Sequence, residues 1–282
     1  MAHAQSVDIL YLLNRSLLGQ RIIVDQSIEQ MAATYKSAKP FPHIVVDHMF
    51  EDQLLDQLLG EMPSLTAKEF LYCNDGHLTQ YGLRSAAGLG ETGFQLVAFL
   101  HSAAFLYFLS EITGIRELLP DPYLQGGGYH VMPPGGKFDV HADRNMAYET
   151  GLTRRLSLIT YLNKSWKHEY GGQFELWNQD GSRREAVVEP LFNRTVIFEI
   201  ADQNFHGVPA PIASPGGRCR TSFAVYYHTA QGQNAAPHSS VFPSNSRKST
   251  IPMRDKQTAI RIARALCPPI VAHAAKKILR WK

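Results

Sequence analysis

Hydrophobic and polar positions divide the chain into three parts with different patterns. In the first part, residues 1–120, apolar positions recur at helical spacing, most clearly in EDQLLDQLLGEM from Glu51. Residues 26–38 and a long buried stretch, FQLVAFLHSAAFLYFLSEIT at 94–113, are also predicted to be helices. The segment FPHIVVDHMF, with β-branched residues after a proline-bounded entry, predicts a strand. We therefore expect a helical support region with one strand.

The pattern changes after ELLPDP, and residues 121–230 contain short apolar-alternating segments broken by Gly, Pro, Asn and Asp. Eight such segments follow one another: YLQGGGYHVM, GKFDVHAD, RLSLITYLN, GGQFELWN, AVVEP, NRTVIFEI, FHGVPAP and RTSFAVYYHT. Many short strands at this spacing favour an antiparallel sandwich or barrel, and a jelly roll in particular. The expected fold is therefore mainly β with packing helices, with a cupin-like jelly-roll core.

The last part, residues 231–282, is a basic extension. The chain has a net charge of +3, but residues 247–282 carry ten Lys or Arg and one acidic residue, or +9, which leaves −6 for the remainder. The segment PPIVAHAAKKILRW places its apolar residues on one helical face and predicts a basic helical tail. Such a tail can contact an anionic membrane or an acidic partner, although packing on the acidic body is the favoured interpretation.

Composition places the chain among ordinary globular proteins, with 44% hydrophobic and 19% charged residues. No break in the pattern argues for two domains, so residues 1–282 are expected to form a single domain. The three cysteines are odd in number and widely spaced, which predicts free thiols rather than disulfides or a Cys-x-x-Cys metal pair. The first residues lack the features of a signal peptide. These observations together predict a cytoplasmic protein.

The first candidate chemistry lies in GKFDVHAD, where His141 and Asp143 are two residues apart. Chance supplies roughly half of one His-x-Asp in a chain of this length, so the pair needs support from elsewhere. Residues two apart on a strand point to the same face. His206, in FHGVPAP between two strand-like segments, is the best third ligand. Two imidazoles and one carboxylate form the facial triad that is typical of non-heme Fe(II) oxygenases.

A candidate clamp for a carboxylate follows on the next strand. In RTSFAVYYHT, Arg220 and Ser222 are two residues apart and share a strand face. A guanidinium matches a carboxylate bidentately, and the hydroxyl adds a further donor. Arg218 would lie on the same face, so strand alternation alone does not separate the two arginines.

Six blocks in this order resemble the 2-oxoglutarate/Fe(II) dioxygenases of the prolyl 4-hydroxylase-like group: GGGYHVMPPGGKFDVHAD, RRLSLITYLNKSW, GGQFELW, PLFNRTVIFE, FHGVPAP and RCRTSFAVYYHT. The resemblance covers about Tyr123 to Thr229, with a weaker match at FPHIVVDHMF. It implies the double-stranded β-helix, a jelly roll, as the fold. It also implies that Fe(II) is the metal and that His141, Asp143 and His206 are its ligands.

The same resemblance implies how 2-oxoglutarate is held. Arg220 matches the family's basic residue for the C5 carboxylate, Ser222 its Arg-x-Ser partner, and Tyr161 a tyrosine that hydrogen-bonds this carboxylate in some members. The spacing of R-x-S and the following FAVYY favours Arg220 over Arg218, although the loop after His206 is longer than in prolyl hydroxylases.

The implied activity is an O2-dependent oxygenase that hydroxylates an unactivated C–H bond and releases succinate and CO2, with ascorbate as a supporting reductant. An amino acid, a peptidyl residue or a small biosynthetic intermediate is the expected substrate. Related halogenases lack the carboxylate ligand, so Asp143 argues for hydroxylation or desaturation. The polar loop ADRNMAYETGLTRR, which contains Arg144 and Arg154, can contribute substrate contacts, with a solvated loop as the alternative.

Two other functions stay open. One is a metal-binding jelly roll that serves as a scaffold without oxygenase activity. The other is a nucleic-acid demethylase of the same superfamily, which the basic tail favours. The acidic body, and the lack of a basic strip with interleaved aromatics near the motif, argue against nucleic acid as a partner. The substrate and the oligomeric state do not follow from the sequence.

Overall fold

The computed structural model describes residues 13, 26–83, 85–148, 150–230 and 238–243. All of them belong to the first of the two units into which the chain divides at residue 246. Apart from its short described segment, the basic extension lies outside the described residues, so its predicted helix and contacts stay predictions.

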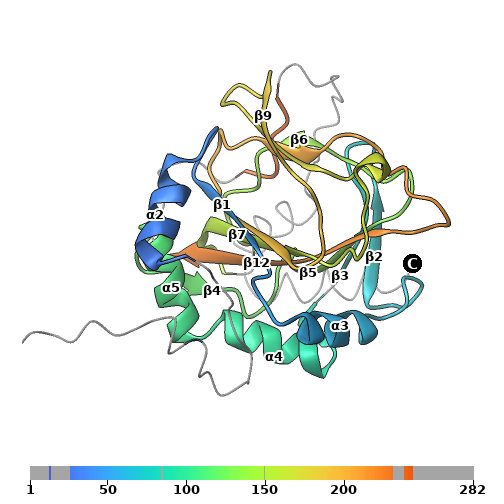
Figure 1. Ribbon diagram of the computed structural model, residues 1–282, viewed down its shortest axis with the longest axis horizontal. Coiled ribbons are helices and arrows are strands. Elements are labelled where there is room, and N and C mark those ends of the chain that lie inside the picture. Colours follow the sequence, from blue (N-terminus) through green and yellow to red (C-terminus); the bar gives the residue numbers. More distant parts are fainter. Residues whose placement is uncertain (1–12, 14–25, 84, 149, 231–237, 244–282) are drawn as a thin grey trace, which may run out of the picture. The chain divides into compact units, whose positions relative to one another are not determined.

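Two antiparallel sheets form the core of the described unit (Figure 1). The larger sheet contains β1 (His43–Asp47), β2 (Phe70–Asn74), β3 (Thr79–Leu83), β4 (Leu119–Pro120), β5 (Gly128–Met132), β7 (Thr153–Tyr161), β10 (Arg194–Glu199) and β12 (Arg220–Thr229). Its order is β1-β10-β7-β12-β5-β3-β2, and β4 pairs with β12. The smaller sheet contains β6 (Phe138–His141), β8 (Phe174–Trp177), β9 (Arg184–Val188) and β11 (His206–Val208), in the order β6-β11-β8-β9. The predicted jelly roll is confirmed, and each of its eight predicted segments forms a strand.

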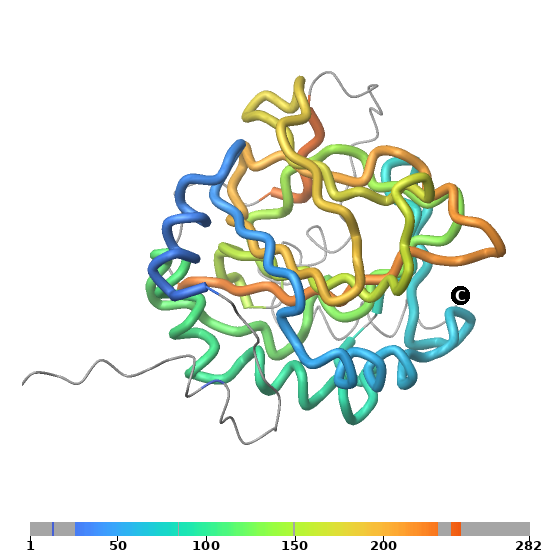
Figure 2. The backbone as a smooth tube through the Cα atoms, viewed as in Figure 1, coloured from blue at the N-terminus to red at the C-terminus, as the bar shows by residue number. Residues whose placement is uncertain are grey.

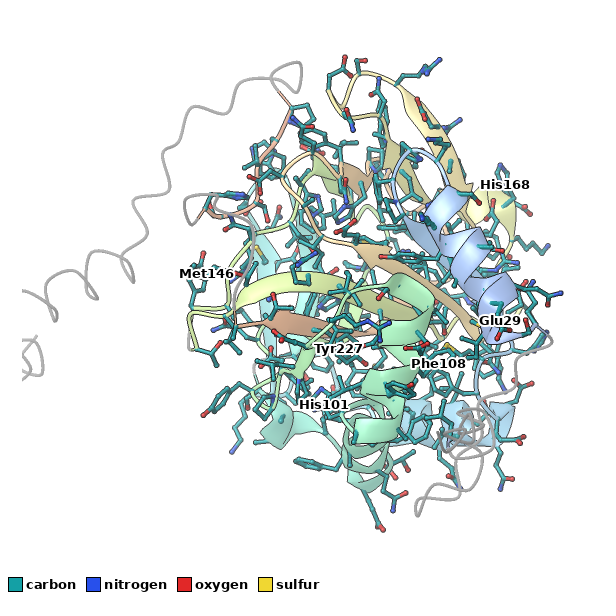
Figure 3. The ribbon with its side chains drawn as sticks, turned by 90° about the vertical axis from the view of Figure 1, so that its left-hand side faces the viewer. Glu29, His101, Phe108, Met146, His168 and Tyr227 are labelled. Atoms are coloured by element: carbon teal, nitrogen blue, oxygen red, sulfur yellow. The ribbon has the colours of Figure 1, made fainter. Side chains whose placement is uncertain are left out.

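Apolar residues of the helices pack on the larger sheet. The helices are α2 (Ile28–Ser37), α3 (Asp52–Gly60), α4 (Glu91–Leu100) and α5 (Ala103–Thr113), with short 3-10 turns η1 at Ala86–Gly88 and η2 at His168–Tyr170. One hydrophobic cluster joins these helices to the outward residues of β7 and β12. Figure 3 shows His101, Phe108 and Tyr227 at this junction, where the Tyr227 hydroxyl donates to the Leu100 carbonyl at 3.1 Å.

Strand β12 explains how one core supports a polar site, because it is buried along its whole length. Phe223, Val225 and Tyr227 belong to the cluster beneath the helices. Ser222 and Tyr226, on the alternate positions, line a cavity between the two sheets. Figure 2 shows β12 in orange between the helices and the strands of the smaller sheet. Because successive residues of a strand point to opposite faces, the apolar residues of β12 pack beneath the helices while its alternate residues face the cavity.

The prediction of a single strand in residues 1–120 is wrong. Strands β2 and β3 form a hairpin, and β3 pairs with β5. The segments FLYCN and TQYGL carry few β-branched residues, so their strand structure depends on pairing with β5 rather than on local propensity. The helical support region therefore also extends the jelly-roll sheet.

The long helix predicted at residues 94–113 is instead two helices, α4 and α5, which meet at an angle of 53°. The break falls at His101 and Ser102, and the Ser102 hydroxyl accepts a hydrogen bond from the Phe105 backbone N–H at 3.2 Å. Ser102 therefore acts as an N-cap, which periodicity alone does not reveal. In the described part of the chain no single helix is long and apolar enough to cross a membrane, and only this bent pair reaches that length and composition together.

Replacing Ser102 with Ala is expected to lower the free energy of unfolding by about 1 kcal/mol, because α5 loses its capping acceptor. Urea unfolding followed by circular dichroism measures this difference. Ser85→Ala is the matched control, since Ser85 precedes η1 without making a side-chain capping bond. Equal stability of the two variants would contradict a capping role for Ser102.

Candidate active site

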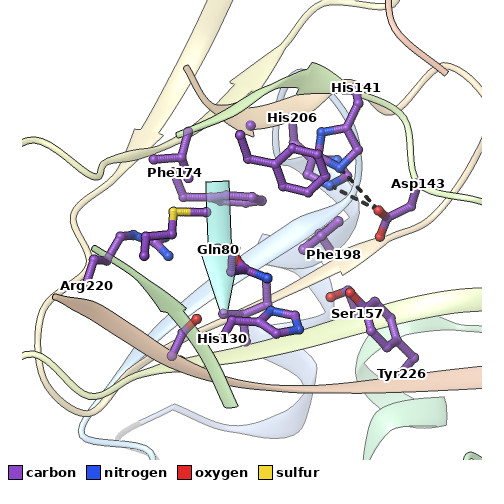
Figure 4. Close-up of a pocket in the computed structure, with 16 residues that line it drawn as sticks. Gln80, His130, His141, Asp143, Ser157, Phe174, Phe198, His206, Arg220 and Tyr226 are labelled. Carbon is purple, nitrogen blue, oxygen red and sulfur yellow. Dashed lines mark ion pairs between the residues drawn. The ribbon is translucent and has the colours of Figure 1, made fainter. Parts of the chain in front are cut away.

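His141, Asp143 and His206 come together in the structure as one cluster. Their potential ligand atoms all lie within 4.8 Å of one another, and no other such cluster of three or more occurs among the described residues. Asp143 Oδ1 lies 3.3 Å from His141 Nε2 and 3.8 Å from His206 Nε2. Figure 4 shows the two imidazoles converging on the carboxylate. This is the facial arrangement of two His and one carboxylate that holds Fe(II) with positions left open.

Strand pairing brings the two histidines together. His206 on β11 is the direct antiparallel partner of His141 on β6, and the ring centroids are 4.6 Å apart. Asp143 follows two residues after His141, so its side chain returns to the same side. The register of a single strand pair therefore fixes the separation of two ligands that are distant in the sequence.

Both imidazoles are oriented for metal binding. His141 Nδ1 donates to the Asp139 carbonyl at 2.8 Å, and His206 Nδ1 donates to the Asn204 carbonyl at 2.9 Å. These bonds fix the tautomer and turn each Nε2 toward Asp143. His141 Nε2 is buried and has no hydrogen-bond partner among the described residues. A metal ion would satisfy this orphaned acceptor, so the donor set fits Fe(II).

Electrostatics keep the ligands in their metal-binding forms. Burial and the neighbouring His141 lower the pKa of His206 to about 4, so its imidazole is neutral at pH 7. Burial alone would raise the pKa of the Asp143 carboxyl, but its interactions with His141 and His206 outweigh this and hold the pKa well below its usual range. A neutral imidazole and an ionised carboxylate are the forms that bind a divalent metal.

Gly207 permits the close approach of β11 to β6. A Cβ at this position would lie 2.9 Å from the Phe138 carbonyl oxygen and 3.0 Å from the Val140 Cα atom, both on β6. Neither is the end of a flexible side chain, so Gly207→Ala must push the strands apart next to His206. We expect this variant to bind Fe(II) or Zn(II) about 10-fold more weakly, since ligand orientation is worth this much.

Metal titration by calorimetry tests the Gly207 prediction. The control is Gly82→Ala in β3, where an added Cβ meets nothing within 4 Å. Wild-type metal affinity in the Gly207→Ala protein would contradict the view that this glycine sets the ligand spacing.

The described segment at residues 238–243 braces the end of β6. Ala142, between two of the ligands, exchanges backbone hydrogen bonds of 2.8 and 3.0 Å with Val241. The Phe242 ring stacks on His77 at 4.2 Å and lies 6.0 Å from the His141 ring. The backbone around two ligands is thus held from the side opposite β11.

The triad lies in the wall of a cavity between the two sheets. Apolar and aromatic residues make up much of the lining: Met132, Phe138, Ile159, Phe174, Phe198 and Val208. Polar lining residues lie at both ends (Figure 4), with Arg220 on one side and Ser157 and Tyr226 across from it. A largely apolar cavity with a few convergent polar groups is the usual form of a small-molecule site.

Arg220 and Ser222 both line this cavity from β12. Arg220 is 3% exposed, and its Nε donates to the Gly172 carbonyl at 2.7 Å. Tyr161 is not a lining residue, but the Arg220 guanidinium lies 5.0 Å from its ring centroid. The Tyr161 hydroxyl is buried without a hydrogen-bond partner among the described residues, and burial raises its pKa to about 12.

The structure separates the two arginines that strand alternation could not. Strand β12 begins at Arg220, so Arg218 precedes the strand and does not follow its alternation. The Arg218 guanidinium donates to the Lys164 carbonyl and lies 5.7 Å from the Trp166 ring. Arg218 is not among the cavity residues, whereas Arg220 is.

Sequence reasoning missed several residues that line the cavity. Gln80 comes from β3, a strand that was not predicted. Ser157 on β7 and Tyr226 on β12 are direct partners in the sheet, and both point inward. Strand alternation from Ser222 would have placed Tyr226 on the cavity side, so this residue had a signal in the sequence.

Comparison with known proteins agrees with the site. The model of the 2OG-Fe(II) oxygenase superfamily matches residues 127–228, which span β5 to β12. No curated protein sequence matches the chain.

Solved structures share the fold at low identity. A Pseudomonas putida prolyl-4-hydroxylase aligns at 21% identity and TM-score 0.50, covering 72% of this chain and 100% of its own. A Trichoplax adhaerens prolyl hydroxylase solved with a hypoxia inducible factor peptide aligns at 16% identity and a TM-score of 0.50, covering 71% of this chain and 88% of its own. HygX from Streptomyces hygroscopicus, solved with nickel and 2-oxoglutarate, aligns at 10% identity and a TM-score of 0.50, covering 76% of this chain and 98% of its own.

A jelly roll with a His-Asp-His triad facing its interior defines the class of non-heme iron oxygenases. With the superfamily match to residues 127–228, these strands resemble an Fe(II)/2-oxoglutarate-dependent dioxygenase, and the solved prolyl hydroxylases share their fold. Fe(II), 2-oxoglutarate and O2 are accordingly its cofactor and cosubstrates.

Proposed function

We propose that the protein hydroxylates an unactivated C–H bond of an amino acid, a peptidyl residue or a small biosynthetic intermediate. In this reaction 2-oxoglutarate loses CO2 and becomes succinate, one atom of O2 enters succinate, and the other enters the new hydroxyl group. Two electrons come from the decarboxylation and two from the C–H bond, which together reduce O2. The observation that carries the proposal is the buried triad in the wall of an otherwise mostly apolar cavity.

Each residue near the triad has a role in this proposal. His141, Asp143 and His206 hold Fe(II), which supplies the redox chemistry with O2 when bound. The remaining protein groups orient the reactants and exclude water. The rings of Phe174 and Phe198 lie 5.4 and 4.7 Å from the His206 ring and shield the metal side of the cavity. A dry site strengthens every electrostatic contact within it.

Arg220, with Ser222 and Tyr161, is proposed to hold the C5 carboxylate of 2-oxoglutarate. A buried guanidinium needs an anionic partner, and the described residues offer Arg220 only a carbonyl and an aromatic ring. The orphaned Tyr161 hydroxyl beside it is a ready donor, and its raised pKa keeps it protonated. The Tyr161 hydroxyl and the Arg220 guanidinium are therefore both suited to bind a carboxylate.

Succinate formation from 2-oxoglutarate tests the proposal. The protein is incubated with Fe(II), ascorbate and a panel of amino acids, peptides and pathway intermediates, and each product is examined by mass spectrometry. We expect succinate in proportion to a product heavier by one oxygen atom, with that atom derived from 18O-labelled O2. Succinate with an unchanged or dehydrogenated product would contradict hydroxylation, and failure to bind 2-oxoglutarate at millimolar levels would favour a scaffold.

A further inference from the structure

A second set of buried polar groups lies across the cavity from Arg220, where the proposed reaction assigns no function. Ser157 is fully buried and lines the cavity, and its hydroxyl has no hydrogen-bond partner among the described residues. Arg154 lies behind Tyr226 and is not itself a lining residue; it is 3% exposed, and its Nε also lacks a partner among the described residues. Between them is Tyr226, a lining residue whose ring lies 3.8 Å below the Arg154 guanidinium. In Figure 4, Ser157 and Tyr226 lie together beside Asp143.

A bulge in β7 turns Arg154 toward this cluster. Ser157 pairs with Tyr226 and Leu156 with Tyr227, but Arg154 pairs with His228, so Arg155 is the extra residue. Strict alternation would place Arg154 on the opposite face of the strand from Ser157. The one extra residue of the bulge brings Arg154 onto the same face as Ser157. Bulges that redirect a side chain in this way are common beside active sites.

The charge of Arg154 has no acidic partner within ion-pair distance in the described part of the chain. Among the described residues, its guanidinium makes one hydrogen bond, from Nη2 to the Gln125 carbonyl at 2.7 Å. Asp121 influences it electrostatically, but both carboxylate oxygens of Asp121 already accept backbone N–H groups, those of Tyr123 and Gln125. Leaving a buried cation without an anion is costly, which indicates that a ligand supplies the anion.

The charges of the loaded site lead to the same conclusion. Fe(II) and Arg220 bring three positive charges, and Asp143 with dianionic 2-oxoglutarate brings three negative charges. The site is therefore neutral before Arg154 is counted, and Arg154 adds one positive charge beside Asp143. Arg144, which follows Asp143 and lies 4.6 Å from the Tyr148 ring, adds further positive potential to this end.

We propose that Arg154, Ser157 and Tyr226 form a recognition site for a carboxylate of the substrate, so that the enzyme acts on small carboxylic acids such as free amino acids. This assignment rests on the proposed function, because it places the substrate beside the same iron site. The guanidinium and two hydroxyl groups supply charge-assisted hydrogen bonds to a planar anion. The anchored carboxylate would hold a nearby C–H bond close to Asp143 and the metal.

Paired ligands test the proposal without knowledge of the true substrate. The Zn(II)- and 2-oxoglutarate-loaded protein is titrated with small carboxylic acids, including free amino acids, and with the primary amide of each. Binding is measured by ligand-observed NMR and calorimetry. N-acetylated dipeptides with a free C-terminus form a second arm, which separates a single amino acid from the end of a longer chain.

The expected result is that acids bind about 10-fold or more tightly than their amides, because hydrogen bonds to charged groups are the strong ones. Arg154→Met should abolish this preference, and Arg154→Lys should keep part of it. Arg155→Met is the matched control, since the neighbouring Arg155 already has an acidic partner, Glu199, at 3.3 Å. Thermal melting shows whether each variant is folded.

Three outcomes would overturn the carboxylate site: amides that bind as well as acids, an unchanged preference in Arg154→Met, or no acid bound at millimolar levels while 2-oxoglutarate still binds. Failure of the proposed function differs from these, because there 2-oxoglutarate itself would not bind or would yield no succinate.

Discussion

Asp143→Ala is expected to lower the affinity for Fe(II) by at least about 100-fold and to abolish succinate formation. Losing an outer hydrogen bond to a ligand already costs roughly 10–100-fold, and Asp143 is the only anionic member of the triad. Without it, the two imidazoles alone would have to hold a divalent cation near Arg154. Calorimetric metal titration and the succinate assay measure both effects.

The control for this variant is Asp56→Ala. Asp56 is a half-exposed carboxylate paired with Lys164 on the surface, where such pairs contribute little. Full 2-oxoglutarate turnover by Asp143→Ala with iron still bound would show that the carboxylate is not a required ligand.

Arg220→Met is expected to raise the KM for 2-oxoglutarate by about 100-fold or more, because removing one partner of a buried charge pair costs roughly 3–5 kcal/mol. The kcat at saturating 2-oxoglutarate should change much less, since the carboxylate is bound equally in the ground and transition states. Initial rates of succinate formation across 2-oxoglutarate concentrations separate KM from kcat.

Arg218→Met is the matched control, because this neighbouring arginine contacts Lys164 and Trp166 outside the cavity. The two variants remove the same group two residues apart. A larger KM increase in Arg218→Met than in Arg220→Met would reverse the assignment of the clamp.

The fold could be predicted from the sequence where local pattern and final environment agree. Alternation marked each strand of residues 121–230, since these strands have an inward and an outward face. The hairpin of β2 and β3 was missed because pairing with β5, not composition, makes it a sheet. The bend between α4 and α5 was missed because their apolar surface is continuous, and only the cap at Ser102 ends the periodicity.

For the site, residue spacing and family resemblance were enough to indicate the triad and the residues of the proposed clamp. Strand alternation did not assign the correct face to Arg218, because this residue precedes its strand. It would also have misplaced Arg154, because a bulge in β7 turns that side chain inward. The contact of Val241 with Ala142 is a single bridge between distant segments and has no sequence signal. Local irregularities and isolated tertiary contacts therefore limited the prediction.

Because Val241 braces Ala142, the metal site can be completed only late in the synthesis of the chain. The ligands and their support come from residues 77, 141, 143, 206 and 242, so the ribosome must produce most of the chain before the centre can assemble. Domains generally begin to fold during synthesis, and contacts between distant segments form late because loop closure is costly. The helices and the β2–β3 hairpin can form while the ligands are still apart. Iron capture is therefore expected to be one of the last events in the maturation of the enzyme, after the residues that follow β12 have left the ribosome.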